Sequence, residues 1–181
     1  MSLIPIVASL GEDADNELEG FVGIPCLLLI RRPRDAIVSR AIFTPEWSLA
    51  FLIREYMRFH NAILPYRDKF VVATFDQTTT DLSRVIRRLN IRFGTAFELF
   101  DHTDANVNQV FNTMEKKQVT HRGAIDNRKI GRPSSERESL KENLANNLDS
   151  PKLSQALKCA DHLFDTFSSL STCPAVDKEN D

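Results

Sequence analysis

The sequence predicts an α/β domain in which a partial parallel sheet is flanked by helices and the C-terminal part is helical. Two apolar runs, Leu27–Ile30 and the β-branched Lys69–Phe75, are typical of strands. Segments with helical periodicity lie between these runs and after them. Because an order of strand, helix, helix, strand and helix favours crossover connections, we expect the two strands to pair in parallel.

The composition fits one globular domain. The chain has 181 residues and a formal net charge of −2, so its overall charge gives no reason to expect binding to nucleic acid. No apolar run approaches the length of a membrane span, and the start lacks a signal-peptide pattern. The three cysteines lie far apart without metal-ligand spacing, which favours reduced thiols, a cytoplasmic protein and no metal. We expect a single domain over 1–181, with a core over 24–170 between an arm, 1–23, and a tail, 171–181.

A basic loop connects the first strand to a helix. The strand Leu27–Ile30 is expected to be buried on both faces, and Arg31 leaves its carboxyl end, where α/β sheets bind ligands. The amino end of the following helix carries unpaired N–H groups and partial positive charge, which suit an anion. Arg31 would offer phosphate a planar fork of donors, and Ser39 would add a hydroxyl. The alternative is a solvated basic loop and a helix serine without a ligand.

The spacing of these residues resembles a family motif. Arg31, then Asp35, then Ser39 eight residues after the arginine, with apolar residues before and between, is similar to the 3′-phosphate-binding motif of sulfotransferases. These enzymes use 3′-phosphoadenosine 5′-phosphosulfate (PAPS) as sulfuryl donor. The resemblance implies a P-loop-like, nucleoside-triphosphate-hydrolase-type fold in which Arg31 and Ser39 bind the donor's 3′-phosphate. It also implies in-line transfer of the sulfuryl group to a hydroxyl or amine of a small-molecule or glycan acceptor.

The segment before the motif departs from the family pattern. Sulfotransferases carry there a strand and a Gly- and Ser/Thr-containing turn that binds the 5′-phosphosulfate, whereas this chain has acidic residues after Gly11 and no Lys or Arg before Arg31. We therefore expect an N-terminally incomplete family domain, with no assigned catalytic base and weakened or lost sulfuryl transfer. The alternative function is a non-catalytic nucleotide-binding or protein-interaction module, in which a second copy or a partner covers the incomplete sheet edge.

The region between the two strands is predicted to be helical. Thr44 as a cap and Pro45 in the first turn predict a helix that continues over Trp47–Leu64 until Pro65 interrupts it. His60 lies near the apolar stripe of this helix. We expect His60 to be packed against other side chains or partly exposed, rather than catalytic.

The end of the second strand carries an aromatic residue, Phe75. In the family, an aromatic residue at this place can contact the adenine. We expect Phe75 to belong to the core first and to contact adenine second. The next helix is predicted over Asp81–Leu89, with a threonine such as Thr80 as its cap and Asn90 near its end.

A short helix is predicted over 108–117, with Val110, Phe111 and Met114 facing inward. The long basic stretch that follows, from Gln118 to Ser135, is predicted to be irregular. In sulfotransferases a late basic, glycine-containing loop closes over the 3′-phosphate. Arg128, Lys129 and Arg132 resemble such a loop, and a flexible basic linker is the equal alternative.

Two helices are predicted at the C-terminal end, over 135–148 and from Pro151 to about Leu170. Asp149, Ser150 and Pro151 form a strong helix start. The apolar stripe of the last helix has helical period, so we expect it to pack into the core rather than to hold a cofactor.

Overall fold

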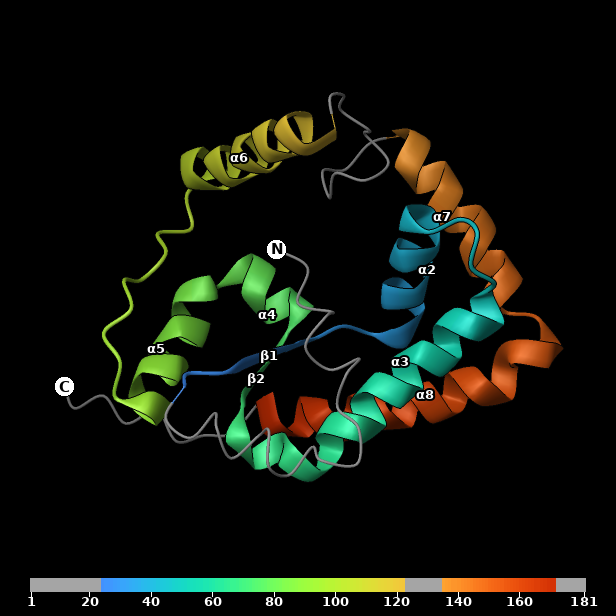
Figure 1. The fold of residues 1–181 in the computed structure, drawn as a ribbon, viewed down its shortest axis with the longest axis horizontal. Helices are drawn as coiled ribbons and strands as arrows, with labels where there is room; N and C mark the ends of the chain where they lie inside the picture. The colour runs from blue at the N-terminus through green and yellow to red at the C-terminus, as the bar shows by residue number, and fades with distance from the viewer. Residues whose placement is uncertain (1–23, 123–134, 172–181) are drawn as a thin grey trace.

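Helices surround a small parallel sheet in a computed structural model of the chain, which describes residues 24–122 and 135–171 (Figure 1). The elements are β1 (Leu27–Ile30), α2 (Pro33–Phe43), α3 (Leu49–Ile63), the 3₁₀ helix η2 (Leu64–Lys69), β2 (Val71–Thr74), α4 (Phe75–Thr80), α5 (Leu82–Phe93), α6 (Asp104–Arg122), α7 (Ser135–Leu148) and α8 (Pro151–Ser171). The described part is thus α/β and mostly helical. The predicted parallel sheet and helical C-terminal part are confirmed at this level.

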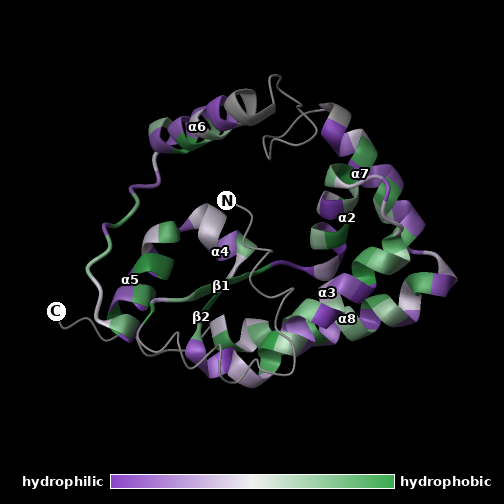
Figure 2. Cartoon of the chain, viewed as in Figure 1, coloured by the Kyte–Doolittle hydropathy of each residue, from purple (hydrophilic) through white to green (hydrophobic). Residues whose placement is uncertain are grey.

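The two strands pair in parallel, with Leu27 opposite Val71 and Ile30 opposite Thr74. The helices α2 and α3, followed by η2, make the connection between the strands. Opposite residues of a parallel pair point to the same face of the sheet. Figure 2 shows β1 as a largely hydrophobic strand, in line with its sequence.

The core lies on the face of the sheet that α3 and α8 cover. Phe164 and Phe167 of α8 pack there against Leu28, Ile30 and Val72. A second apolar cluster joins α2 and α3 to α7 and to the first turns of α8. Both clusters arise because the apolar stripes of α3 and α8 follow helical period.

Strand β1 is buried on one face only, which corrects the prediction that both faces are buried. Leu27 and Leu29 are 38% and 45% exposed. Val71 and Ala73 of β2 point to the same face but are buried, since α5 packs against β2 there. A run of apolar residues does not reveal how many helices cover a strand, and among the described helices none covers this face of β1 as α5 covers β2.

The start of α3 differs from the predicted one. Thr44 ends α2, where its hydroxyl donates to the backbone oxygen of Arg40 at 3.0 Å. Ser48 caps α3 instead, and its side chain accepts a hydrogen bond from the N–H of Phe51 at 3.2 Å. Both Thr44 and Ser48 are good capping residues, so the sequence alone did not distinguish them. The helix ends before Pro65, as predicted.

A short helix, α4, follows β2 directly, so the strand is shorter than predicted and Phe75 begins the helix. Thr74 and Gln77 form a reciprocal capping box at this junction. Asp81, in place of the predicted threonine, caps α5. The helix α5 continues past the predicted stop to Phe93. Gly94 follows as its C-cap, with a φ of 61° in the left-handed region that glycine adopts readily.

Helix α6 is longer than predicted at both ends and is set apart from the helices around the sheet (Figure 1). The stretch predicted to be irregular from Gln118 is helical as far as Arg122. Val110 and Met114 are each 46% exposed, so the prediction that they face inward is wrong for both. The cause is that α6 has no extensive contact with another described element.

The C-terminal helices begin and end close to the predicted positions, with Pro151 as the first residue of α8. The predicted arm over 1–23, positions 123–134 of the predicted loop and positions 172–181 of the predicted tail lie outside the described residues.

His60 is buried between α3 and α8, in line with the packed position that was one of the two expected for it. Its ring stacks on Tyr56 with 4.0 Å between the ring centroids, and its Nδ1 lies 2.8 Å from the backbone oxygen of Tyr56. Because a carbonyl oxygen only accepts, Nδ1 carries the proton. Burial lowers the pKa of His60 from its ordinary value of 6.5, although the bond to Tyr56 opposes this shift.

Replacement of Phe167 by alanine tests the core. Phe167 is 0% exposed, so Phe167→Ala should lower the free energy of unfolding by about 3–5 kcal/mol, through lost burial and the cavity that remains. The measurement is urea unfolding followed by circular dichroism. The control is Phe97→Ala at a half-exposed phenylalanine, which should lose far less. Equal losses in the two variants would contradict the packing.

The free energy of unfolding should decrease as the pH is lowered, because of His60. The pKa of His60 is lower in the folded state than its unfolded-state value of about 6.5. The contribution of the neutral His60 side chain to the free energy of unfolding is therefore fully present above that pH. As the pH falls below that value, the unfolded chain takes up a proton that the folded chain resists, and stability is lost by at most about 1.4 kcal/mol per pH unit. Urea unfolding from about pH 8 to pH 5 should show this slope, and His60→Phe should remove it. A slope that persists unchanged in the variant would assign the loss to other groups.

Candidate anion-binding site

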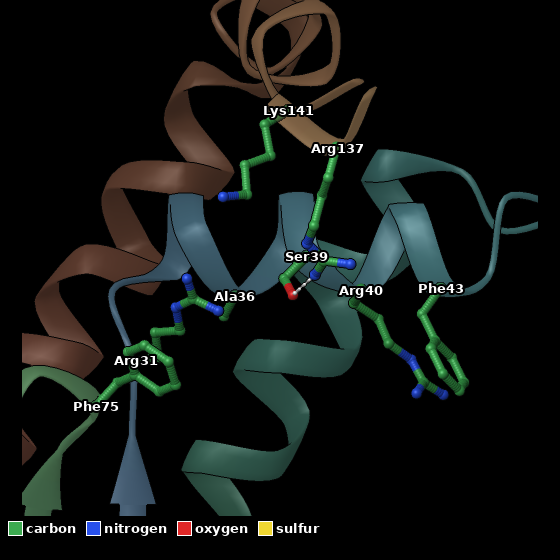
Figure 3. A pocket seen from close by; sticks show the side chains of 8 residues that line it. All are labelled: Arg31, Ala36, Ser39, Arg40, Phe43, Phe75, Arg137 and Lys141. Atoms are coloured by element: carbon green, nitrogen blue, oxygen red, sulfur yellow. Dashed lines mark hydrogen bonds between the residues drawn. The ribbon is translucent and has the colours of Figure 1, made fainter. Parts of the chain in front are cut away.

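A cavity of about 520 Å³ lies beside α2 at the carboxyl ends of the two strands (Figure 3). Its lining residues are Arg31, Ala36, Ser39, Arg40, Phe43, Phe75, Arg137 and Lys141. Four of these described residues are basic and none is acidic. The volume falls in the range of small-molecule sites, and the position is the one at which α/β sheets bind ligands.

Arg31 is held at the end of β1 by its backbone and by its side chain. The hydroxyl of Tyr56 donates to the backbone oxygen of Arg31 at 2.9 Å. Burial raises the pKa of Tyr56, so this hydroxyl stays protonated and remains a donor. The Arg31 guanidinium carbon lies 4.2 Å from the centroid of the Phe75 ring, a cation–π contact that orients the charged group at the cavity wall.

The other arginines of the same loop have different partners. The guanidinium of Arg32 lies over the ring of Phe164 in α8, 5.4 Å from its centroid. Arg34 donates two hydrogen bonds to the carboxylate of Asp149, at 2.5 and 2.8 Å, which connects the start of α2 to the turn between α7 and α8. Arg31 is therefore the arginine of this loop that lines the cavity.

Ser39 of α2 is joined to Arg137 of α7. Nη2 of Arg137 donates to the Ser39 hydroxyl oxygen at 3.1 Å. Arg137 is only 8% exposed. Burial and, second, the charge of Arg31 lower the pKa of the Arg137 guanidinium, whereas Glu138 raises it. Arginine remains charged in spite of such shifts, so the site contains buried positive charge.

The other two basic side chains, Lys141 and Arg40, extend toward different ends of the cavity (Figure 3). Lys141 lies one helical turn after Arg137, and its Nζ is 2.6 Å from a carboxylate oxygen of Glu138. Figure 3 shows Lys141 and Arg31 extending into the same region beside Ser39. Arg40 extends to the other end of the cavity together with Phe43, and its guanidinium lies over the ring of Trp47.

The structure brings together three of the six residues predicted to bind the donor: Arg31, Ser39 and Phe75. The other three, Arg128, Lys129 and Arg132, lie outside the described residues. The cavity does not lie at the amino end of α2, where the anion was expected to bind. It follows the side of this helix, because the residues that α2 contributes recur at intervals of three and four positions.

Sequence reasoning did not select Arg137, Lys141 or Arg40. Arg137 and Lys141 are four positions apart and thus share a face of α7. That spacing was the available signal, but it does not show which element packs against this face of α7. Ser39 and Arg137 are 98 positions apart in the chain, and only the packing of α7 on α2 brings them together.

No known family model matches the chain, and neither a curated protein nor a solved structure matches it. The resemblance to sulfotransferases therefore rests on the motif residues of the sequence alone.

Neither a metal cluster nor a membrane span is found in 24–122 and 135–171. These ranges contain no group of three or more His, Cys, Asp or Glu side chains arranged to hold a metal ion. They also contain no helix that is both long enough and apolar enough to cross a bilayer.

Proposed function

We propose that the chain is a sulfotransferase-like protein that binds a 3′-phosphorylated adenine nucleotide, with PAPS as the donor. The observation that carries this proposal is the cavity at the strand ends, where Arg31, Ser39 and Phe75 meet among basic side chains. A phosphate monoester is bound best by guanidinium groups through charge-assisted, bidentate hydrogen bonds. The all-positive charge of the described lining favours such a ligand over a neutral or cationic one.

The serine can serve the ligand and Arg137 at once. A hydroxyl has one hydrogen to donate and two lone pairs that accept. Ser39 accepts from Arg137, so its own hydrogen can be donated to a phosphate oxygen. Arg31 would approach the same phosphate from the end of β1.

Phe75 supports the site mainly through Arg31. Its ring contacts the guanidinium at 4.2 Å, so one role of the ring is to orient that group. This contact favours a positioning role for Phe75 over stacking on the adenine. Such orientation lowers the entropy lost when the arginine binds an anion.

Sulfuryl transfer requires, in addition to a bound donor, an acceptor and a base. The acceptor oxygen or nitrogen attacks the sulfur, the bond between sulfur and the 5′-phosphate oxygen breaks, and a base takes the acceptor's proton. His60 is buried against Tyr56 and Phe167 and does not line the cavity. We assign no base, and the proposal concerns the donor-binding half of the reaction.

Replacement of Arg31 tests the proposed site. Arg31→Ala removes a charge-assisted contact worth about 1.5–3 kcal/mol, so affinity for 3′-phosphoadenosine 5′-phosphate should fall roughly ten- to a hundredfold. Ser39→Ala should cost less, since it removes a neutral donor. The measurement is calorimetric titration of the full chain, with adenosine 5′-phosphate as the control ligand.

The matched control variant is Arg87→Ala, an exposed arginine on α5 that does not line the cavity. It should bind like the unmodified chain. Equal affinity of Arg31→Ala and the unmodified chain, or equal affinity for the two nucleotides, would refute the assignment of the site.

A second candidate function is a protein-interaction module with a second copy as the partner. The observation that favours it is the apolar face of β1, where Leu27 and Leu29 are exposed. Ile24, which precedes the strand in the chain, is exposed as well. Parallel sheets are almost always covered on both faces. Such a surface on a small sheet favours association.

Sedimentation velocity over a range of chain concentrations tests this second function. We expect the unmodified chain to self-associate and Leu29→Asn to sediment as a monomer, because the substitution places a polar group in the shared face. Leu29 is exposed, so the variant should fold normally. A chain that stays monomeric at every concentration would contradict self-association.

A further inference from the structure

Helix α7 places two basic side chains at the cavity, opposite the motif around Arg31. Its apolar residues Leu144 and Leu148 pack in the cluster that α2 and α3 share. This packing fixes the helix on α2. Arg137 and Lys141 lie toward the other end of the helix, and both line the cavity (Figure 3).

The electrostatic setting of Arg137 favours an anion at this place. Its side chain is largely buried, and the cavity lining among the described residues contains three further cations and no carboxylate. Arg31 is close enough for its charge to lower the pKa of Arg137. Like charges in a partly buried site repel strongly, and an anion between them turns this repulsion into attraction.

The geometry also prepares Arg137 for a ligand. The bond to Ser39 orients the plane of the guanidinium beside the cavity. Lys141 has three N–H donors, of which the contact with Glu138 uses one. A phosphate between Ser39 and α7 would thus meet preorganised donors from both helices.

We propose that Arg137 and Lys141 are phosphate-binding residues and that α7 forms the second wall of the anion site. This inference rests on the proposed function, since it concerns the same cavity. It adds residues outside the strand-loop-helix motif. A bound phosphate would add a further bridge between α2 and α7, because donors of both helices would bind it.

The test is calorimetric titration of the full chain with 3′-phosphoadenosine 5′-phosphate. Arg137→Gln removes the charge and should weaken binding about tenfold or more. Arg137→Lys keeps the charge but loses the planar fork, so it should recover part of that loss. Lys141→Gln should weaken binding less and should reduce the dependence of affinity on salt.

Two controls separate binding from folding. Lys152→Gln changes an exposed lysine of α8 that does not line the cavity, and it should bind as the unmodified chain does. Thermal unfolding without nucleotide should show each variant folded. Because Arg137 is buried, Lys141→Gln keeps the test decisive if the arginine variants unfold.

The outcomes distinguish this inference from the proposed function. Unchanged affinity in the folded α7 variants, together with a loss in Arg31→Ala, would overturn the role of α7 and leave the proposed function in place. Binding by the unmodified chain that does not require the 3′-phosphate would overturn both. Loss in Arg137→Gln and Lys141→Gln, with none in Lys152→Gln, would support the second wall.

Discussion

The parallel pairing of β1 with β2 is the constraint on which the candidate site depends. The register places Ile30 opposite Thr74, so the next residues, Arg31 and Phe75, leave the sheet side by side. Antiparallel strands would send these two residues to opposite ends. The cation–π contact between them is thus a direct product of strand direction.

The arginines of the basic loop after β1 have two roles: two of them hold helices together, and one lines the cavity. Arg32 packs over Phe164, and Arg34 binds Asp149 in the turn between α7 and α8. Arg31 is the one that faces the cavity. Charge clusters in sequence do not show such a division, because the partners of Arg32 and Arg34 lie more than a hundred positions away in the chain.

The distance along the chain between interacting residues separates the features that could be predicted from those that could not. Strand and helix periodicities are local, so both strands, α8 and its start at Pro151 were predictable. Arg31 and Ser39 were selected from the strand-loop-helix pattern and the motif resemblance, and Phe75 from the resemblance, all of which depend on residues close together in the sequence. Arg137 was not selected, because its role depends on how α7 packs on α2.

Burial was the least predictable property. An apolar run shows that a strand or helix has hydrophobic surface but not what covers it. Leu29 of β1 and Met114 of α6 were both expected to be inside, and both are about half exposed. The difference lies in the neighbours: α5 packs against β2, and α6 has no extensive contact with any other described element.

The most direct measurement of the central claim is nuclear magnetic resonance of the arginine side chains during titration with 3′-phosphoadenosine 5′-phosphate. The account predicts that the Nε–Hε signals of Arg31 and Arg137 shift together and saturate, while that of Arg87 on α5 stays in place. Adenosine 5′-phosphate should leave all three nearly unchanged. Signals of Arg31 and Arg137 that stay fixed while the nucleotide binds, or that shift no more than the signal of Arg87, would contradict a phosphate site at the strand ends.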